Sequence, residues 1–166
     1  MRLNFGCGIK KIEGYINVDI DPTVKPDVLS DTVDMAIFSE CTVDEIYASH
    51  LIEHLSYIEF DKAIRSWRRI LKHGGIIVLE CPDFEGVCKE FLKADEEGKW
   101  VSYRKTWHSI IEHFYGNQKT LYQYHKNGFT RNRLKSILTS VGFRDIQFLE
   151  PAYKYCPCIK VKATKP

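Results

Sequence analysis

The strongest constraint on the fold is an apolar run without alternation, Ile76 to Leu79, which lies between Gly74-Gly75 and Pro82. Glycine and proline commonly mark the ends of a strand. A strand with one face in water would alternate apolar and polar residues. Because this run does not alternate, it predicts a strand covered on both faces, as in the parallel sheets of α/β proteins.

Further strand and helix signals alternate along the chain. Short strands are expected at residues 2–5, 15–20, 27–30, 45–48, 145–149 and 158–163. Apolar residues at helical spacing predict one helix over residues 60–71 and a second that follows Thr130 and ends at Gly142. This alternation predicts an α/β fold, with a Rossmann-like, mostly parallel sheet and helices on both faces.

Length, charge and cysteine content set broad limits. The 166 residues suit one domain, 1–166. The 24 Lys and Arg against 22 Asp and Glu leave a net charge of +2, so neither nucleic acid nor a membrane is expected as a partner. No apolar run reaches the roughly 20 residues of a membrane span, and no export signal is visible. The six cysteines are therefore expected to be reduced thiols of a cytoplasmic protein.

Two glycines follow the first expected strand as Gly6-Cys7-Gly8. They allow a tight turn whose backbone N–H groups can face a ligand. The dinucleotide pattern G-x-G-x-x-G is not met, because Lys11 stands where its third glycine would be. Asp19 ends the next strand, where an acid can accept hydrogen bonds from both hydroxyls of a ribose. Alone, Asp19 is equally consistent with a turn before Pro22, but beside the loop it favours a nucleoside.

The connection between the loop and the second strand is short. Only six residues separate Gly8 from Tyr15, whereas a parallel crossover with a helix usually needs about a dozen. The first crossover helix is therefore expected to be shortened or missing. A pyrophosphate depends strongly on a helix N-terminus, so this spacing favours a cofactor without phosphate over NAD.

Together these segments resemble class I S-adenosylmethionine-dependent methyltransferases. They are most similar to small methyltransferase type 11-like proteins with the same shortened first crossover. The resembling segments are residues 3–8, 16–21, 43–55, 67–75 and 127–143, which follow the family's order and span nearly the whole chain. The resemblance implies a final antiparallel strand and S-adenosylmethionine as the cofactor.

The resemblance also implies roles for individual residues. The loop Asn4-Phe5-Gly6-Cys7-Gly8 would approach the methionine part of the cofactor, and Asp19 would hold the ribose. Ile20 would pack on the adenine, and Asp31 would lie near its amino group. Ser49 and His50 would border the site of methyl transfer.

Two other readings of the chain stay open at this point. His50-Leu51-Ile52-Glu53-His54 matches H-x-x-E-H, in which histidines at i and i+4 of a helix bind zinc and the glutamate acts as base of a peptidase. That motif needs a helix, and here it begins where a strand ends, so no metal is assigned. The second alternative is a catalytically inert module that binds a nucleoside or S-adenosylmethionine.

The segment 84–130 is the expected cover of the substrate. It holds ten aromatic residues, Phe84, Phe91, Trp100, Tyr103, Trp107, Phe114, Tyr115, Tyr122, Tyr124 and Phe129, which as a set suggest an aromatic-walled pocket. The acceptor is expected to be a small molecule, with a sugar or polysaccharide precursor as the specific hypothesis. His50 and His125 are the candidate bases for a hydroxyl acceptor. The sequence does not indicate the oligomeric state.

Overall fold

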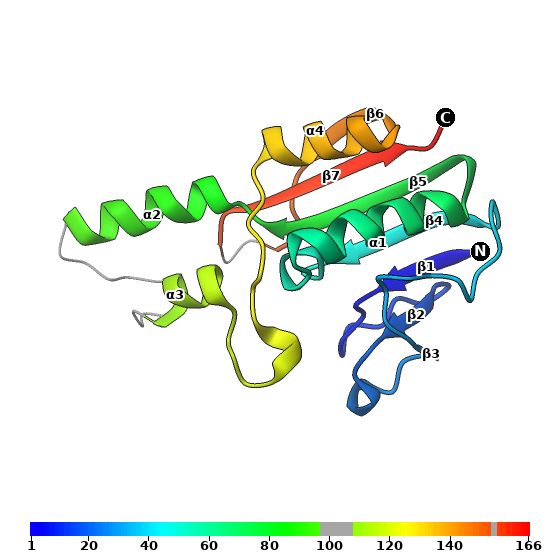
Figure 1. Cartoon of the computed structure of the whole chain (residues 1–166). Helices are drawn as coiled ribbons and strands as arrows, with labels where there is room; N and C mark the ends of the chain where they lie inside the picture. The colour runs from blue at the N-terminus through cyan, green and yellow to red at the C-terminus, as the bar shows by residue number, and fades with distance from the viewer. Residues whose placement is uncertain (97–107, 154–155) are drawn as a thin grey trace.

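Seven strands form one sheet in the order β3-β2-β1-β4-β5-β7-β6 in the computed structural model, which describes residues 1–96, 108–153 and 156–166 (Figure 1). The strands are β1 (Arg2–Phe5), β2 (Ile16–Asp19), β3 (Val28–Leu29), β4 (Val43–Ser49), β5 (Leu71–Pro82), β6 (Arg144–Leu149) and β7 (Cys158–Thr164). The helices are α1 (Tyr57–Ile70), α2 (Phe84–Glu96), α3 (His108–Tyr115) and α4 (Arg131–Val141), with short 3₁₀ turns at Pro22–Val24, Ile52–His54 and Leu121–Gln123.

The predicted sheet is confirmed. Strands β3, β2, β1, β4 and β5 pair in parallel, and β7 is antiparallel to both β5 and β6. Strand β5 is longer than its apolar centre predicts, because it begins at Leu71 and continues through Gly74-Gly75. Its central residues Ile77 and Leu79 are fully buried, as the lack of alternation indicated.

Helix α1 follows β4 and supplies the core of one sheet face. A capping box begins it, in which Ser56 and Glu59 each bond the other's backbone N–H. The helix buries Ile64 and Trp67 against the sheet, and Trp67 packs on Phe5 with ring centroids 5.3 Å apart. Full burial of one such apolar side chain contributes roughly 1.5–3 kcal/mol. Helix α4 lies beside α1 on the same side of the sheet (Figure 1).

No helix lies between β1 and β2, so the predicted loss of the first crossover helix is confirmed in a fully described part of the chain. Two buried asparagines support the short connection instead. The Asn4 side chain donates to the carbonyl oxygen of Lys10 at 3.2 Å and to Oδ1 of Asn17 at 2.9 Å. The same Asn17 oxygen accepts from the Ile12 N–H at 2.9 Å. Side-chain amides thus satisfy backbone groups that a helix would satisfy internally.

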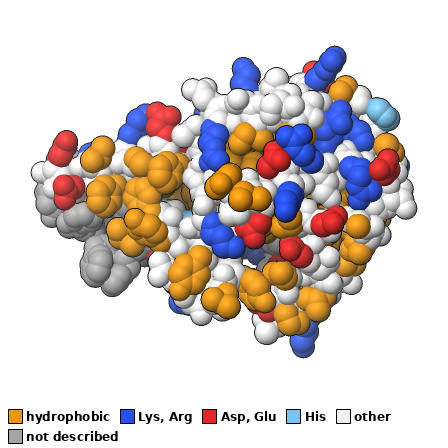
Figure 2. Space-filling model, in the orientation of Figure 1, with side chains coloured by type: hydrophobic (Ala, Val, Ile, Leu, Met, Phe, Trp, Pro, Cys, Tyr) orange, Lys and Arg blue, Asp and Glu red, His pale blue; other side chains and the backbone are white. Residues whose placement is uncertain are grey.

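Helices α2 and α3 extend away from the sheet, beyond the end of β5 (Figure 1). Phe114 of α3 packs edge-on against Phe84 and Phe91 of α2. Apolar side chains gather over α2 on the face drawn in Figure 2, while positive and negative groups are interspersed over the rest of that face. Among the described helices, none has the length and apolar character to cross a membrane.

Candidate cofactor and acceptor site

Three parallel strands end at one edge of the sheet, and the predicted site residues follow those ends. Gly6 comes directly after β1, Asp19 is the last residue of β2, and His50 comes directly after β4. In open α/β sheets, ligands bind outside the carboxyl ends of the strands. The register places Phe5 opposite both Val18 and Ala48, which aligns the three ends.

Hydrogen bonds hold the glycine loop, Gly6-Cys7-Gly8, against β2. Gly6 and Gly8 have positive φ angles of 61° and 50°, a region that glycine enters without steric cost. The Cys7 N–H donates to the Val18 carbonyl at 3.2 Å, and the Gly8 N–H donates to Oδ2 of Asp19 at 2.7 Å. These N–H groups are therefore engaged within the chain, and do not face a ligand as the glycine pattern suggested.

Asp19 holds the glycine loop in place and can accept further hydrogen bonds. Its Oδ2 accepts from Gly8, and its Oδ1 accepts from the Asp21 N–H at 2.9 Å. Each carboxylate oxygen has about two acceptor positions, so each retains one. Asp19 is half-buried, beside exposed Ile20.

A cavity of about 270 Å³ opens over this edge. Six of the ten cofactor-binding residues predicted from the sequence line it, namely Gly6, Gly8, Asp19, Ile20, Asp31 and His50. The other four do not: Asn4 bonds Asn17, Phe5 packs in the core, Cys7 is buried, and Ser49 lies outside the lining. The pattern had no signal for Val33 and Leu51, which add apolar wall to the same cavity.

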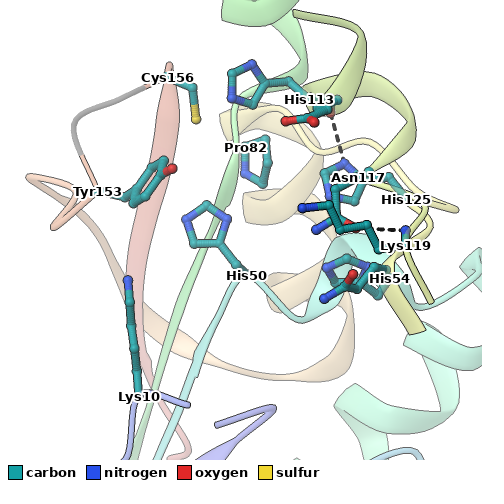
Figure 3. A pocket seen from close by; sticks show the side chains of 13 residues that line it. Lys10, His50, His54, Pro82, His113, Asn117, Lys119, His125, Tyr153 and Cys156 are labelled. Atoms are coloured by element: carbon teal, nitrogen blue, oxygen red, sulfur yellow. Dashed lines mark hydrogen bonds between the residues drawn. The ribbon is translucent and has the colours of Figure 1, made fainter. Parts of the chain in front are cut away.

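A second cavity, of about 360 Å³, shares part of its lining with the first, and Figure 3 shows the residues that line it. Its lining is mostly polar and includes Lys10, Asn117, Lys119 and Tyr153. Three residues line both cavities: His50, His54 and Gln123. These three side chains therefore stand where the two spaces meet.

His50 occupies the junction in a constrained conformation. Its φ is +53°, and its backbone N–H donates to the Glu80 carbonyl at 2.7 Å. Its Nδ1 lies 3.1 Å from Oε1 of Glu53, while its Nε2 is buried without a hydrogen-bond partner among the described residues. Burial alone would lower the pKa of His50, but the bond to Glu53 and the charge of that carboxylate outweigh it and raise the pKa.

His54 and His125 lie against each other in the lining of the polar cavity, with ring centroids 4.8 Å apart. Nδ1 of His54 lies 3.1 Å from the carbonyl oxygen of Tyr124, and Nδ1 of His125 lies 2.9 Å from that of His113. Burial lowers the pKa of His125, which favours its neutral form. Both candidate bases from the sequence, His50 and His125, therefore line the polar cavity.

The helix that an H-x-x-E-H peptidase motif requires is absent. Residues 52–54 form a single 3₁₀ turn, and His50 precedes it in the left-handed region. His50 and His54 therefore do not share a helix face as in that motif. His50 contacts the motif's own glutamate instead.

The expected aromatic wall does not form from the described aromatic residues of 84–130. Phe84 and Phe91 each pack on Phe114, and Phe129 packs on Phe60 in the core. Of the described aromatic residues in this segment, only Tyr122 lines either of the two cavities. Trp100, Tyr103 and Trp107 lie outside the described residues.

All six cysteines are free. Cys156 and Cys158 have their sulfur atoms 3.1 Å apart, and Cys156 lines the polar cavity. A hydrogen bond from Cys158 lowers the pKa of the Cys156 thiol.

Comparison with known proteins agrees with this geometry. Residues 3–79 match the family model of a methyltransferase domain. A solved S-adenosylmethionine-dependent methyltransferase from Archaeoglobus fulgidus is 20% identical, with a TM-score of 0.65 over 99% of this chain and 85% of that one. A possible histamine N-methyltransferase from Thermotoga maritima is 16% identical, with a TM-score of 0.65 over 99% and 81%. No curated protein sequence matches the chain.

A further similar structure contains bound ligands. It is the 1,6-didemethyltoxoflavin-N1-methyltransferase of Burkholderia thailandensis, with bound 1,6-didemethyltoxoflavin and S-adenosylhomocysteine. It is 12% identical to this chain, with a TM-score of 0.59 over 99% of this chain and 70% of that one. Residues 3–79 thus resemble a methyltransferase domain, and these solved structures share the fold over nearly the whole chain, in agreement with the fold that the sequence predicted.

The residues of the first cavity fit that cofactor chemically. Asp19 has acceptor positions for ribose hydroxyls. Ile20, Val33 and Leu51 offer apolar surface to a purine. A Cβ added at Gly8 would meet open space, so the backbone leaves room for a ligand at this point.

Proposed function

We propose that this chain transfers a methyl group from S-adenosylmethionine to a small polar acceptor that occupies the second cavity. The observation that carries the proposal is the shared wall: His50, His54 and Gln123 line both the Asp19 cavity and the polar cavity. Two adjoining sites are what a direct transfer between two bound molecules needs, because much of its acceleration comes from holding the reactants in line.

Three of the predicted residues then have defined tasks in the Asp19 cavity. Asp19 accepts hydrogen bonds from the ribose, and Ile20 packs against the adenine near Asp31. The bound cofactor supplies a methyl group on a sulfonium sulfur. Lys126 also lines this cavity and is exposed, so it stands near the entrance.

His50 is the residue we assign to proton transfer. It lines both cavities, whereas His125 lines only the polar one. Glu53 fixes its Nδ1, and its buried Nε2 has no hydrogen-bond partner among the described residues, so Nε2 is the nitrogen that can take a proton. When the acceptor is a hydroxyl, its proton passes to Nε2 of His50, its oxygen bonds to the methyl carbon, and the carbon–sulfur bond breaks to leave S-adenosylhomocysteine.

The polar lining favours an acceptor rich in hydrogen-bonding groups. Amide, imidazole, ammonium and phenol groups of Asn117, His113, Lys119 and Tyr153 face the second cavity. This lining is compatible with a sugar or polysaccharide precursor, which stays our specific prediction. The segment 84–130 contributes Asn117 and His113, in agreement with its proposed role as substrate cover. A cytoplasmic location likewise stays a prediction.

Binding is tested first by calorimetry with S-adenosylhomocysteine. We expect one site per chain, and no heat at high micromolar ligand would overturn the proposal. Turnover is then tested by transfer of a labelled methyl group to a panel of sugars, nucleotide sugars and small amines. Cofactor binding without transfer to any of them would favour the inert module.

The assignment of His50 is tested with His50→Gln, which keeps a side chain of similar size. We expect methyl transfer to fall by about 10²–10⁴-fold with cofactor affinity nearly kept. His73→Gln is the matched control, because His73 is exposed and its Nδ1 lies close to the carbonyl oxygen of Pro166, away from both cavities. An equal rate in His50→Gln and wild type would exclude His50 as the base.

A further inference from the structure

The wall between the two cavities contains a group of possible metal ligands. Glu53, His54 and His125 each present one donor atom, and these atoms lie within 4.8 Å of one another. Glu53 and His54 belong to the short turn after β4, whereas His125 arrives from the segment that follows α3. Figure 3 shows His54 and His125 close together at one side of the polar cavity.

Glu53 is buried with one oxygen unused. The residue is 2% exposed, and Oε1 accepts from His50. Oε2 is buried and has no hydrogen-bond partner among the residues that the structure describes. A buried carboxylate is costly unless it is paired or coordinates a metal. Oε1 is paired with His50, so Oε2 is the oxygen that remains free to bind a cation.

The two histidines are oriented in the way that metal ligands are. A carbonyl oxygen can only accept, so the bonds from Nδ1 of His54 to Tyr124 and from Nδ1 of His125 to His113 place the proton on each Nδ1. Each Nε2 then carries a free lone pair. Metal-binding histidines commonly have their second nitrogen fixed by a backbone carbonyl in this manner.

We propose that Glu53, His54 and His125 bind one divalent transition-metal ion, with zinc the ion that suits them best. Two histidines and one glutamate are the ligands of a class of catalytic zinc sites that keep a fourth position open. Zinc lies about 2.0–2.1 Å from such ligands, so small side-chain rotations would draw the three donors together. The open position would face the polar cavity, where it can hold an acceptor oxygen.

This site differs from the peptidase motif in the sequence. The motif would use His50 and His54, but His50 is bonded to Oε1 of Glu53 and the second histidine is His125. The site would serve the proposed methyl transfer, on which its role rests. Metal binding is measured without turnover, so the two proposals can fail separately.

The probe is Co²⁺ added to the metal-free full chain, with Zn²⁺ as competitor. We expect one equivalent of Co²⁺ to give visible d–d absorption bands, which Zn²⁺ then removes. His54→Ala and His125→Ala should each weaken Co²⁺ binding by roughly 100-fold or more, since loss of even a supporting group costs about 10–100-fold. Glu53→Gln should also weaken Co²⁺ binding. If this variant does not fold, the two histidine variants still test the proposal.

Two controls separate this site from other ligands. His73→Ala removes a distant exposed histidine and should bind Co²⁺ as the wild type does. Cys156→Ser should also leave the spectrum unchanged, because no thiolate belongs to the site. Intense near-ultraviolet bands of a cobalt–thiolate bond that vanish in Cys156→Ser would overturn the proposal. So would full-affinity binding in His54→Ala and His125→Ala, or no binding to the wild type in a preparation that binds S-adenosylhomocysteine.

Discussion

Asn4 and Asn17 lie side by side on adjacent strands, and Nδ2 of Asn4 donates to Oδ1 of Asn17 at 2.9 Å in the buried interior. Through this pair, β1 and β2 share a hydrogen-bond network with the connection between them. Asn17 also donates from Nδ2 to the Tyr15 carbonyl at 3.2 Å and to Oδ2 of Asp27 at 2.8 Å. The position of the glycine loop and of Asp19 therefore depends on these amides.

Asn17→Ala should lower the free energy of unfolding by about 2–3 kcal/mol, because it leaves the Asn4 amide and the Ile12 N–H without a buried partner. Urea unfolding followed by circular dichroism measures this. Asn117→Ala is the control, since Asn117 is exposed and accepts from the nearby Lys119 N–H, and it should change stability by less than about 0.5 kcal/mol. Equal effects of the two substitutions would show that the amide pair does not support the crossover.

Protonation of the Asp27 carboxyl should make the stability of the fold depend on pH. Hydrogen bonds from the backbone N–H and the side chain of Asn17 lower the pKa of this carboxyl. A carboxyl whose pKa is lower folded than unfolded contributes its full stabilisation above the unfolded pKa of about 3.9, and loses it as the pH falls through the folded pKa. Asp27→Asn should therefore melt below the wild type at pH 7, and the difference should shrink on acidification toward pH 2. A constant difference across this range would contradict the assignment.

The sequence predicted those strands and helices whose signals lie within a few neighbouring residues. Apolar runs, the N-cap Thr130 and the C-cap Gly142 indicate strands and helices directly, and α4 begins and ends where they predict. The six-residue spacing was enough to predict the lost helix, because chain geometry limits a crossover. Asp19 was also predicted to lie at the end of its strand, as it does in β2.

Other features depend on distant contacts, and the sequence could not show them. The bond between Asn4 and Asn17 is not visible in the pattern, because buried and exposed asparagines look alike in a sequence. His54 and His125 are brought together by the path of the chain after α3, which no periodicity encodes. The aromatic residues of 84–130 were expected around the substrate, but Phe84 of α2 and Phe114 of α3 pack edge-on against each other.

Gly6 and Gly8 should respond differently to alanine. Both have positive φ, so each substitution costs roughly 1–2 kcal/mol in the backbone. At Gly6 the new Cβ would also lie 2.8 Å from Cδ1 of Leu51, whereas at Gly8 it would meet nothing within 4 Å. Gly6→Ala should therefore destabilise the fold by about 1–3 kcal/mol more than Gly8→Ala. Urea unfolding compares them, and Leu51→Ala should recover part of the Gly6→Ala loss in the double variant.

Asp19→Ala should weaken S-adenosylhomocysteine binding by about 10–100-fold, since a hydrogen bond to a charged group contributes roughly 1.5–3 kcal/mol. Titration calorimetry measures the loss. Asp34→Ala, which removes an exposed acid outside the cavity lining, is the control and should bind as the wild type does.

Asp19 also braces Gly8, so lost affinity alone does not identify a ribose contact. The 2′-deoxy form of the ligand separates the two roles. Wild-type protein should prefer the ribose form, because the carboxylate accepts from the 2′-hydroxyl, and Asp19→Ala should lose that preference. If Asp19→Ala weakens both ligands equally and keeps the wild-type preference, Asp19 acts on the loop alone, and another group must recognise the ribose.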